Sequence, residues 1–503
     1  MRWRGGVLAA VVCIAVLMLT FGIPTAAARG TGGHTTAGWA NHTIVVLPNG
    51  QNDTADIQAA FNACASYGPG CTVQLVKGTY YTEQIAVYGF QGSFVGAGQG
   101  RTFIQALPNL PDPNSTYNTA TVPFWAGNPT GAAGSNPWPD LFTFVGGTFS
   151  ISRMTINEPY ANPITSPGWF SLYSSYVGYT TALAAVILVT GDEAASAAIT
   201  HVTINGAGGD LTIPLGTPST FNLDSSIVYE GMFLPAGWSD PFVDQIPVSG
   251  TFSLTDSVIY WSESAFYFEN LLDATVVVSS NSISSTPAPE YVDVSNSQLY
   301  FVGNSFTNIM YGGAIIGSNS YYKTNLLPST VYVVGNYIAA NWQGSGIVLL
   351  DYGPSEGIPA TLNAVVTGNT IVSDNSCECY TEAVSDVIID DYLVSGVLSG
   401  NTVIGGGGGV FVYNTSAVVR GNVILGAYDG VYLWNVTNTP VTGNVVKASV
   451  QYGIALTNES SYNLVAHNLV KGSGVYDLYW DGTGTDNTWV HNLCQTSSPA
   501  GLC

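Results

Sequence analysis

Residues 409–444 read GVFVYNTSAVVRGNVILGAYDGVYLWNVTNTPVTGN and contain one short pattern twice. A Gly-Asn pair occurs at Gly421-Asn422 and, 22 residues later, at Gly443-Asn444. Apolar residues alternate in the runs 409–414 and 430–435, and each run ends in asparagine. Period-two alternation that ends at a turn residue indicates a short β-strand. The stretch therefore predicts strands and tight turns in a repeat of 22 residues.

The pattern extends well beyond this stretch. Its asparagine recurs with spacings of 23, 32, 33, 32, 21, 22, 24 and 24 residues, at Asn281, Asn304, Asn336, Asn369, Asn401, Asn422, Asn444, Asn468 and Asn492. Such a period indicates a repeat architecture, and the longer spacings indicate coils that carry loop insertions. Helical repeats would show a 3.6-residue apolar period, which is absent. The sequence predicts an all-β parallel β-helix whose repeated turn carries an asparagine ladder.

The N-terminus has the composition of a targeting segment. Arg2 and Arg4 precede an apolar run, 7–23, and the small residues of 24–28 follow. This order predicts a signal peptide, residues 1–28, cleaved after Ala28; an uncleaved anchor is the alternative. The predicted organisation continues with a linker (29–43), a β-helix (44–493) that contains a loop-rich insertion (108–181), and a C-terminal tail (494–503). No later segment is long and apolar enough to span a bilayer, so the mature chain is expected to be exported without one.

Six cysteines remain after the signal peptide, an even number that suggests disulfides in an exported chain. Spacing favours two short loops, Cys64–Cys71 and Cys494–Cys503. The pair Cys377 and Cys379 leaves three interpretations open: a strained local bridge, two free thiols or half of a metal site.

Charge excludes one class of partner. The 503-residue chain has 10 Lys and Arg against 32 Asp and Glu, a net charge of −22, and only 8% of its residues are charged. Losing Arg2 and Arg4 with the signal peptide leaves 8 cations and a net charge of −24. So few cations cannot neutralise many phosphates, and nucleic-acid binding is therefore not expected.

The start of the array carries motifs of its own. Asp53 is placed to cap a helix whose apolar face contains Ile57, Ala60, Phe61 and Cys64. A V-x-L-x-x-G-x-Y strand, 73–80, and G-A-G-x-G-x-T, 96–102, follow. Together these motifs resemble the N-terminal cap of right-handed parallel β-helix proteins of the pectin lyase-like superfamily. The resemblance, with the asparagine repeats, covers most of 44–493. It implies the fold and leaves the activity open, since lyases, hydrolases, epimerases and non-enzymes share it.

The resemblance also ranks the activities that this chain could have. Lyases of the superfamily use Lys or Arg, often with calcium, whereas the cations here are scattered. We therefore place hydrolase above lyase. A hydrolase needs two carboxylates roughly 5–9 Å apart. Aligning the strands on their terminal turn residues puts Glu269 and Asp293 on adjacent coils of one face, and crowds Asp351, Asp390 and Asp391 on the coils that follow. The predicted catalytic residues are Glu269, Asp293, Asp390 and Asp391. Calcium is the alternative role for Asp351, Asp390 and Asp391, because hard oxygen ligands suit it; no cofactor is otherwise required.

The same alignment stacks four aromatic residues, Phe411, Tyr413, Tyr432 and Trp434, which we interpret as a platform for sugar rings. The alternative is that neighbouring loops cover them. His467 and His491 share a repeat position and are expected to stack as ordinary turn residues.

The sequence is compatible with two classes of function. The first is an exported protein that acts on polysaccharide, foremost as a glycoside hydrolase with lyase as a variant. The second is a non-catalytic β-helix that binds glycans or forms a coat.

Overall fold

The computed structural model describes residues 42–83, 85–106, 141–157, 183–205, 223–233, 245–260, 264–284, 290–309, 312–319, 327–340, 344–351, 361–373, 388–391 and 394–503. The predicted signal peptide and cleavage site, Cys377 and Cys379 lie outside these residues. So do the predicted linker, apart from residues 42 and 43, and the predicted insertion, apart from 141–157.

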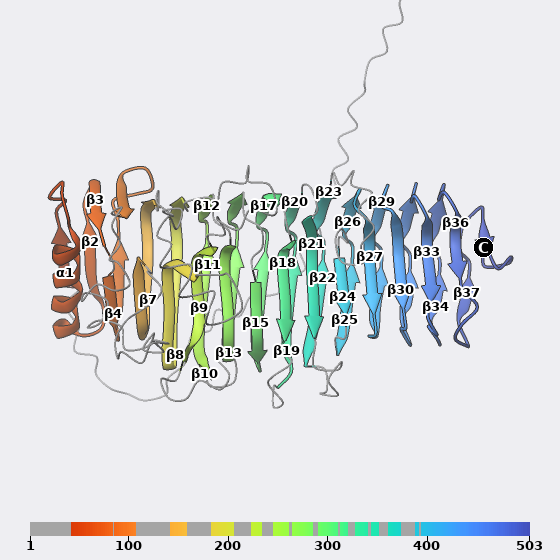
Figure 1. Ribbon diagram of the computed structural model, residues 1–503, viewed down its shortest axis with the longest axis horizontal. Coiled ribbons are helices and arrows are strands. Elements are labelled where there is room, and N and C mark those ends of the chain that lie inside the picture. The colour runs from red at the N-terminus through yellow and green to blue at the C-terminus, as the bar shows by residue number, and fades with distance from the viewer. Residues whose placement is uncertain are drawn as a thin grey trace, which may run out of the picture. The chain divides into compact units, whose positions relative to one another are not determined.

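The described chain winds through three parallel ladders of strands, so that one coil contributes a strand to each (Figure 1). The first sheet contains β4 (Ile85–Tyr88), β9 (Leu223–Phe233), β15 (Glu290–Ser295), β18 (Gly312–Asn319), β21 (Gly344–Asp351), β24 (Ile388–Asp391), β27 (Gly408–Tyr413), β30 (Asp429–Trp434), β33 (Tyr452–Thr457), β36 (Tyr476–Trp480) and β38 (Ser497–Ser498).

The second sheet contains β1 (Thr43–Val46), β2 (Cys71–Leu75), β5 (Gln91–Val95), β11 (Val248–Thr255), β16 (Gln298–Val302), β19 (Ser329–Val334), β22 (Leu362–Thr367), β25 (Ser395–Ser399), β28 (Ala417–Arg420), β31 (Pro440–Thr442), β34 (Leu464–Ala466) and β37 (Thr488–Val490).

The third sheet contains β3 (Gly78–Thr82), β6 (Thr102–Ala106), β12 (Val258–Tyr260), β14 (Ser282–Ser284), β17 (Ser305–Ile309), β20 (Tyr337–Ala340), β23 (Thr370–Ser373), β26 (Thr402–Ile404), β29 (Val423–Leu425), β32 (Val445–Lys447) and β35 (Leu469–Lys471).

Three long strands bend from one sheet into the next: β7 (Phe142–Asn157), β8 (Leu183–Asn205) and β13 (Ser264–Ser279). The short strand β10 (Gln245–Ile246) pairs antiparallel with β9. Strand β7 lies within the stretch predicted to be a loop-rich insertion, and β38, from the predicted tail, pairs with β36 in the last coil.

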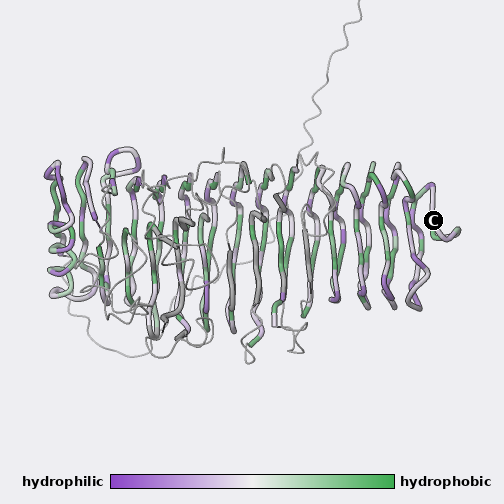
Figure 2. The backbone as a smooth tube through the Cα atoms, viewed as in Figure 1, coloured by the Kyte–Doolittle hydropathy of each residue, from purple (hydrophilic) through white to green (hydrophobic). Residues whose placement is uncertain are grey.

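Alternation along each strand fills the interior with apolar side chains, as the changes of hydropathy along the coils show (Figure 2). In the first sheet, paired residues of successive coils form a column that is at most 1% exposed: Phe142, Ile187, Ile227 and Phe266. Gly430 is the second residue of β30, and a Cβ there would lie 2.3 Å from the carbonyl oxygen of Gly453. The next coil passes so close that only glycine fits, which explains the glycine before this apolar run.

The predicted asparagine ladder is confirmed. From Asn281 to Asn492 each side-chain amide donates to the Oδ1 of the next ladder asparagine at 2.9–3.0 Å. Each Oδ1 also accepts from the backbone N–H of the asparagine one coil earlier. All nine asparagines are buried. The repeated residue therefore satisfies both its own amide and the backbone of its turn.

The N-terminal coil is closed by helix α1 (Thr54–Tyr67), which buries the four apolar residues expected from the sequence. The disulfides Cys64–Cys71 and Cys494–Cys503 are both present. The expectation that Asp53 caps the helix through its side chain is wrong. Its carboxylate instead accepts the N–H groups of Asn49 and Tyr81 at 2.7 and 2.9 Å, which joins the helix start to β3.

Candidate functional site

Two columns of paired residues run across the coils of the first sheet, between positions whose side chains fill the core. Column A passes through Thr190, Glu230, Glu269, Val292, Ser318, Leu350, Asp391, Tyr413, Trp434 and Thr457. Column B, two residues earlier in each strand, passes through Leu188, Val228, Tyr267, Glu290, Ile316, Val348, Ile389, Phe411, Tyr432, Ala455 and Tyr479. Because successive residues of a strand point to opposite faces, the two columns share one face of the sheet.

The alignment that put Glu269 and Asp293 on one face of adjacent coils is wrong. Glu269 pairs with Val292, and Asp293 stands one position further along, between the pairs 269–292 and 271–294. The alignment failed because Asn270 does not end its strand: β13 continues to Ser279. The true counterpart of Asn296 is Asp273, whose Oδ1 accepts the Asn296 side-chain amide.

The carboxylate position directly paired with Glu269 is Glu230, on β9. Glu269 itself is buried, with 4% of its surface exposed. Sequence reasoning missed Glu230 because the coils before Asn281 lack the repeated asparagine by which the later coils can be aligned. A weaker signal was present: an apolar-x-aromatic-Glu pattern occurs at 227–230 and again at 266–269.

The acidic cluster predicted at Asp351, Asp390 and Asp391 is divided by the register. Asp391 pairs with Leu350 and Tyr413 in column A, whereas Asp390 pairs with the core residues Leu349 and Val412. Asp351 is 2% exposed and bonds to the residues at the start of β22. Its Oδ2 accepts the N–H groups of Thr361 and Leu362 at 2.6 and 3.0 Å and the Thr361 hydroxyl at 3.2 Å. The structure thus offers no support for calcium at Asp351.

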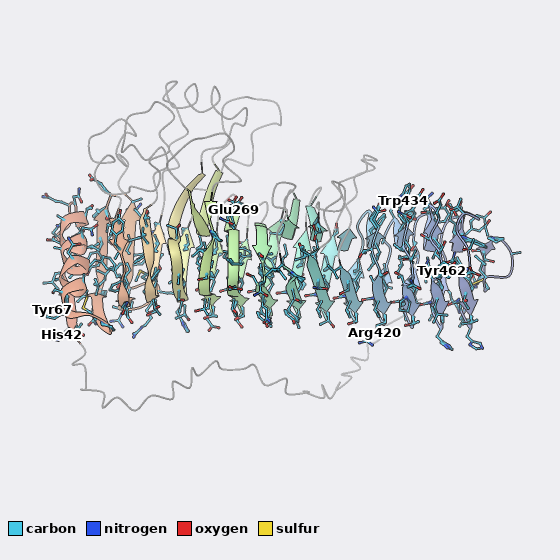
Figure 3. The ribbon with its side chains drawn as sticks, turned by 90° about the horizontal axis from the view of Figure 1, so that it is seen from below. His42, Tyr67, Glu269, Arg420, Trp434 and Tyr462 are labelled. Carbon is cyan, nitrogen blue, oxygen red and sulfur yellow. A yellow bond between two sulfur atoms is a disulfide. The ribbon has the colours of Figure 1, made fainter. Side chains whose placement is uncertain are left out.

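The four aromatic residues predicted to stack lie together on β27 and β30. Ring centroids are 5.1 Å apart for Phe411–Tyr432, 6.3 Å for Tyr413–Trp434 and 6.4 Å for Tyr432–Trp434. Trp434 is the exposed member, at 39%, whereas Phe411 is 8% exposed. We call these four residues the aromatic platform. Its Trp434 lies at the same edge of the solenoid as Glu269 (Figure 3).

Further tyrosines, which sequence reasoning missed, follow the platform toward the C-terminus. Tyr452 stacks on Tyr479 with centroids 4.4 Å apart and planes 10° apart, and Tyr476 lies 6.2 Å from Tyr479. The aromatic surface therefore continues over β33 and β36. Tyr452 precedes a glycine-led apolar run as Asp429 does in the preceding coil, which was the available signal.

Asp429, at the start of β30, is a buried carboxyl beside this surface. It is 6% exposed, and its Oδ1 accepts the Tyr452 N–H at 3.0 Å. Burial raises the pKa of Asp429 to about 6, and the hydrogen bond from Tyr452 opposes part of that rise. Burial also raises the pKa of Tyr432, and the negative charges of Asp429 and Asp481 add to it. Two carboxyl groups thus lie near the platform.

We expect Asp429→Asn to stabilise the protein increasingly as pH rises. Because folding raises the pKa of Asp429 from 3.8 to about 6, its carboxyl group does not destabilise the fold below pH 3.8. The destabilisation grows as pH rises from 3.8 to about 6 and is constant above that. The advantage of the variant should therefore grow by about 3 kcal/mol between pH 4 and pH 8. Asparagine keeps an oxygen for the Tyr452 N–H. Denaturant midpoints at pH 4, 6 and 8 measure this; a constant difference would contradict it. Exposed Asp256→Asn is the control.

The chain is a right-handed parallel β-helix, as the cap motifs indicated, built on three parallel sheets. Within it, residues 360–498 match the model of a family described as periplasmic copper-binding protein (NosD). No curated protein sequence matches the chain significantly.

Solved structures resemble the chain in fold. The A-module of mannuronan C-5 epimerase AlgE6 from Azotobacter vinelandii is 14% identical with a TM-score of 0.48, over 88% of this chain and 95% of that one. A variant of the periplasmic alginate epimerase AlgG is 12% identical with a TM-score of 0.45, over 83% and 77%. The catalytic unit of a GH87 α-1,3-glucanase from Streptomyces thermodiastaticus is 13% identical with a TM-score of 0.36, over 88% and 66%. None of these similarities assigns an activity to this chain.

The described residues do not fit a copper centre. Copper prefers imidazole, thiolate and thioether ligands. Residues 360–498 contain no methionine, and Cys494 is engaged in a disulfide. His467 and His491 stack with ring centroids 5.0 Å apart, as expected from their repeat position. In the part of the chain that the structure describes, no group of three or more His, Cys, Asp or Glu residues could hold a metal ion.

Proposed function

We propose that this protein is an exported enzyme that acts on a polysaccharide at the first sheet, foremost as a glycoside hydrolase. The observation that carries the proposal is column A, in which Glu230 and Glu269 share one line with Tyr413 and Trp434. Glycosidases need a carboxyl pair and a surface that holds sugar rings, and one face supplies both. The predicted signal peptide and the two disulfides support export.

The length of the face favours a polymer as the substrate. Column A passes from Glu269 to Trp434 in six steps between neighbouring coils. At ~4.8 Å per step the two residues are ~29 Å apart. A disaccharide cannot reach from one to the other, so the platform would hold a part of the chain far from the bond that is cleaved.

The spacing of the two glutamates suggests the stereochemistry. Paired residues on neighbouring parallel strands are ~4.8 Å apart. Because Glu230 and Glu269 are paired on neighbouring strands, retention, which needs the closer pair of carboxyl groups, is the outcome that we propose. In that mechanism one carboxyl group acts as general acid while the other attacks the sugar. Asp391, further along column A, remains a secondary candidate; Asp293 and Asp390 lie off the column.

The cations support hydrolysis over elimination. A lyase of the kind the superfamily resemblance implies needs a basic Lys or Arg at the reacting sugar. Among the described residues, none of the six cations lies in a first-sheet segment, since Arg153 is on the part of β7 beyond that sheet: Lys77, Arg101, Arg153, Arg420, Lys447 and Lys471. We therefore keep the polysaccharide lyase as a lesser variant, and no cofactor is assigned.

The test is a screen of the purified protein against plant, algal and microbial polysaccharides. New reducing ends without absorbing unsaturated products are the expected result. Unsaturated products would replace the hydrolase with a lyase. Retention of a glycan without any product would replace it with the second function, a non-catalytic glycan-binding β-helix. The exposure of Trp434 with the burial of Glu269 is the observation that favours this second function.

Trp434→Ala should weaken retention on glycan-containing gels roughly tenfold or more, because stacking on an exposed indole is worth ~1–3 kcal/mol for planar rings and comparable for sugars with apolar faces. The far-UV spectrum and melting temperature should not change, since the indole is 39% exposed. Tyr337→Ala is the matched control, because Tyr337 is 44% exposed on the third sheet, away from the platform. Equal losses in the two variants would argue against a specific platform.

A further inference from the structure

A concave surface lies where the second sheet turns into the third. It is at the edge of the solenoid where Figure 3 labels Arg420, opposite Trp434. It is a shallow groove of about 590 Å³ lined by Thr367, Ser399, Gly400, Arg420, Gly421, Thr442, Gly443 and His467. Neither the carboxylates nor the aromatic residues of the proposed function contribute to it.

The turn residue preceding the ladder asparagine is glycine in six successive coils, from Gly303 to Gly443, and the groove lies over the last three of them. Gly400, Gly421 and Gly443 have φ of 63–65°, and no atom lies within 4 Å of a Cβ placed on any of them. In the next coil His467 takes the same position, with a φ of 57°. The floor of the groove is therefore bare backbone, and an imidazole closes one end.

Arg420 is the cation of this groove. It is exposed, and its guanidinium makes no hydrogen bond or ion pair with a described residue. Its strand neighbours are Ser399 and Thr442, which carry hydroxyls instead of charge.

The hydrogen-bond donors that the groove can offer to a ligand belong to side chains. The N–H groups of Gly400, Gly421 and Gly443 donate to the carbonyls of Arg420, Thr442 and Ala466 at 3.0, 3.0 and 3.2 Å. Phosphate sites in proteins commonly use a row of free backbone N–H groups, which this groove lacks. One guanidinium, one hydroxyl and one imidazole suit an anion of single charge, which the planar fork of arginine binds through two oxygens.

We propose that the groove binds a singly charged oxyanion carried by a sugar, a carboxylate or a sulfate ester, with Arg420 as its anchor. Thr442 and His467 supply the flanking hydrogen bonds. The glycine floor lets a pyranose ring lie against the backbone. The site is independent of the proposed function, since it lies on another edge and uses other residues.

The test compares retention of the full mature chain in gels that contain one glucan backbone in three forms: carboxymethyl cellulose, cellulose sulfate and neutral hydroxyethyl cellulose. We expect tighter retention by at least one anionic form than by the neutral one, and the form that is retained identifies the oxyanion. Arg420→Gln should weaken anionic retention roughly tenfold, the loss expected for a charge-assisted hydrogen bond. It should leave neutral retention and the melting temperature unchanged.

Lys447→Gln is the matched control, because it removes the same charge from the exposed end of a third-sheet strand outside the groove. Less than a twofold change is expected. An equal loss in both variants, or no preference of the wild type for an anionic form, would overturn the proposal. Trp434→Ala separates the two sites: it should weaken retention by all three forms alike, whereas Arg420→Gln acts on the anionic forms alone.

Discussion

Asn422→Ala should lower the free energy of unfolding of its part of the solenoid by roughly 3–5 kcal/mol. Asn422 is 0% exposed, and its side chain takes part in four hydrogen bonds. Its Oδ1 accepts the backbone and side-chain N–H groups of Asn401 at 2.9 and 3.0 Å. Its Nδ2 donates to Leu398 O and Asn444 Oδ1 at 2.9 and 3.0 Å. Alanine leaves two donors of Asn401 buried without an acceptor, and each such group costs ~1–3 kcal/mol.

Denaturant melts and local hydrogen exchange measure this effect, since a stacked repeat need not unfold in one step. Asn435→Gly is the matched control: Asn435 is exposed, has a φ of 49° that glycine keeps, and donates one exposed hydrogen bond to Asn414 at 2.8 Å. It should cost less than about 1 kcal/mol. The double variant with Asn444→Ala should cost less than the sum of the single ones, because the two residues share a hydrogen bond. An unchanged midpoint for Asn422→Ala would contradict a stabilising ladder.

Glu269→Gln should reduce polysaccharide hydrolysis at least ~100-fold, the contribution of a positioned general acid or base. Glutamine keeps the volume and the hydrogen-bonding oxygen of this buried residue, so the fold and glycan retention should persist. Only the ability to ionise or to give up an acidic proton is lost. Initial rates of reducing-end formation measure the effect. Glu230→Gln should behave alike, because both members of a carboxyl pair are required.

Asp273→Asn is the matched control, since Asp273 is an exposed acid on the same strand, β13. Its rate should remain within twofold of the wild type. A wild-type rate for Glu269→Gln would remove the glutamate pair from the mechanism and turn attention to Asp391. Loss of retention together with activity would show that Glu269 serves the fold instead of the chemistry.

The sequence predicted well those features that depend on one coil repeating the next. Asn422 and Asn444 occupy equivalent turns, so the spacing alone predicted their contact. The same equivalence brought Tyr413 next to Trp434 and His467 next to His491. Coils N-terminal to Asn281 carry no such mark, and for that reason Glu230 was missed.

Register was the main source of error. Asn270 looks like a strand end, and its φ of 53° suits a turn. The chain nevertheless continues as β13, because Phe268, Leu271 and Ala274 pack into the core on either side of it. Asn296 stands opposite Asp273 instead of Asn270, so the alignment was wrong by three residues. An odd shift exchanges the two faces of a strand, and the expected shared face of Glu269 and Asp293 was therefore wrong.

By itself, the sequence determined the solenoid, its asparagine ladder, its two short disulfides and the aromatic stack, because all of these arise from local patterns repeated at a regular interval. Tertiary structure alone decided which carboxylates share a column and which are buried. Asp351 ends a strand and Asp429 begins one, yet Asp351 accepts three hydrogen bonds from Thr361 and Leu362 whereas burial raises the pKa of Asp429 to about 6. Desolvation depends on what the next coil places over a residue, and no spacing along the chain encodes that.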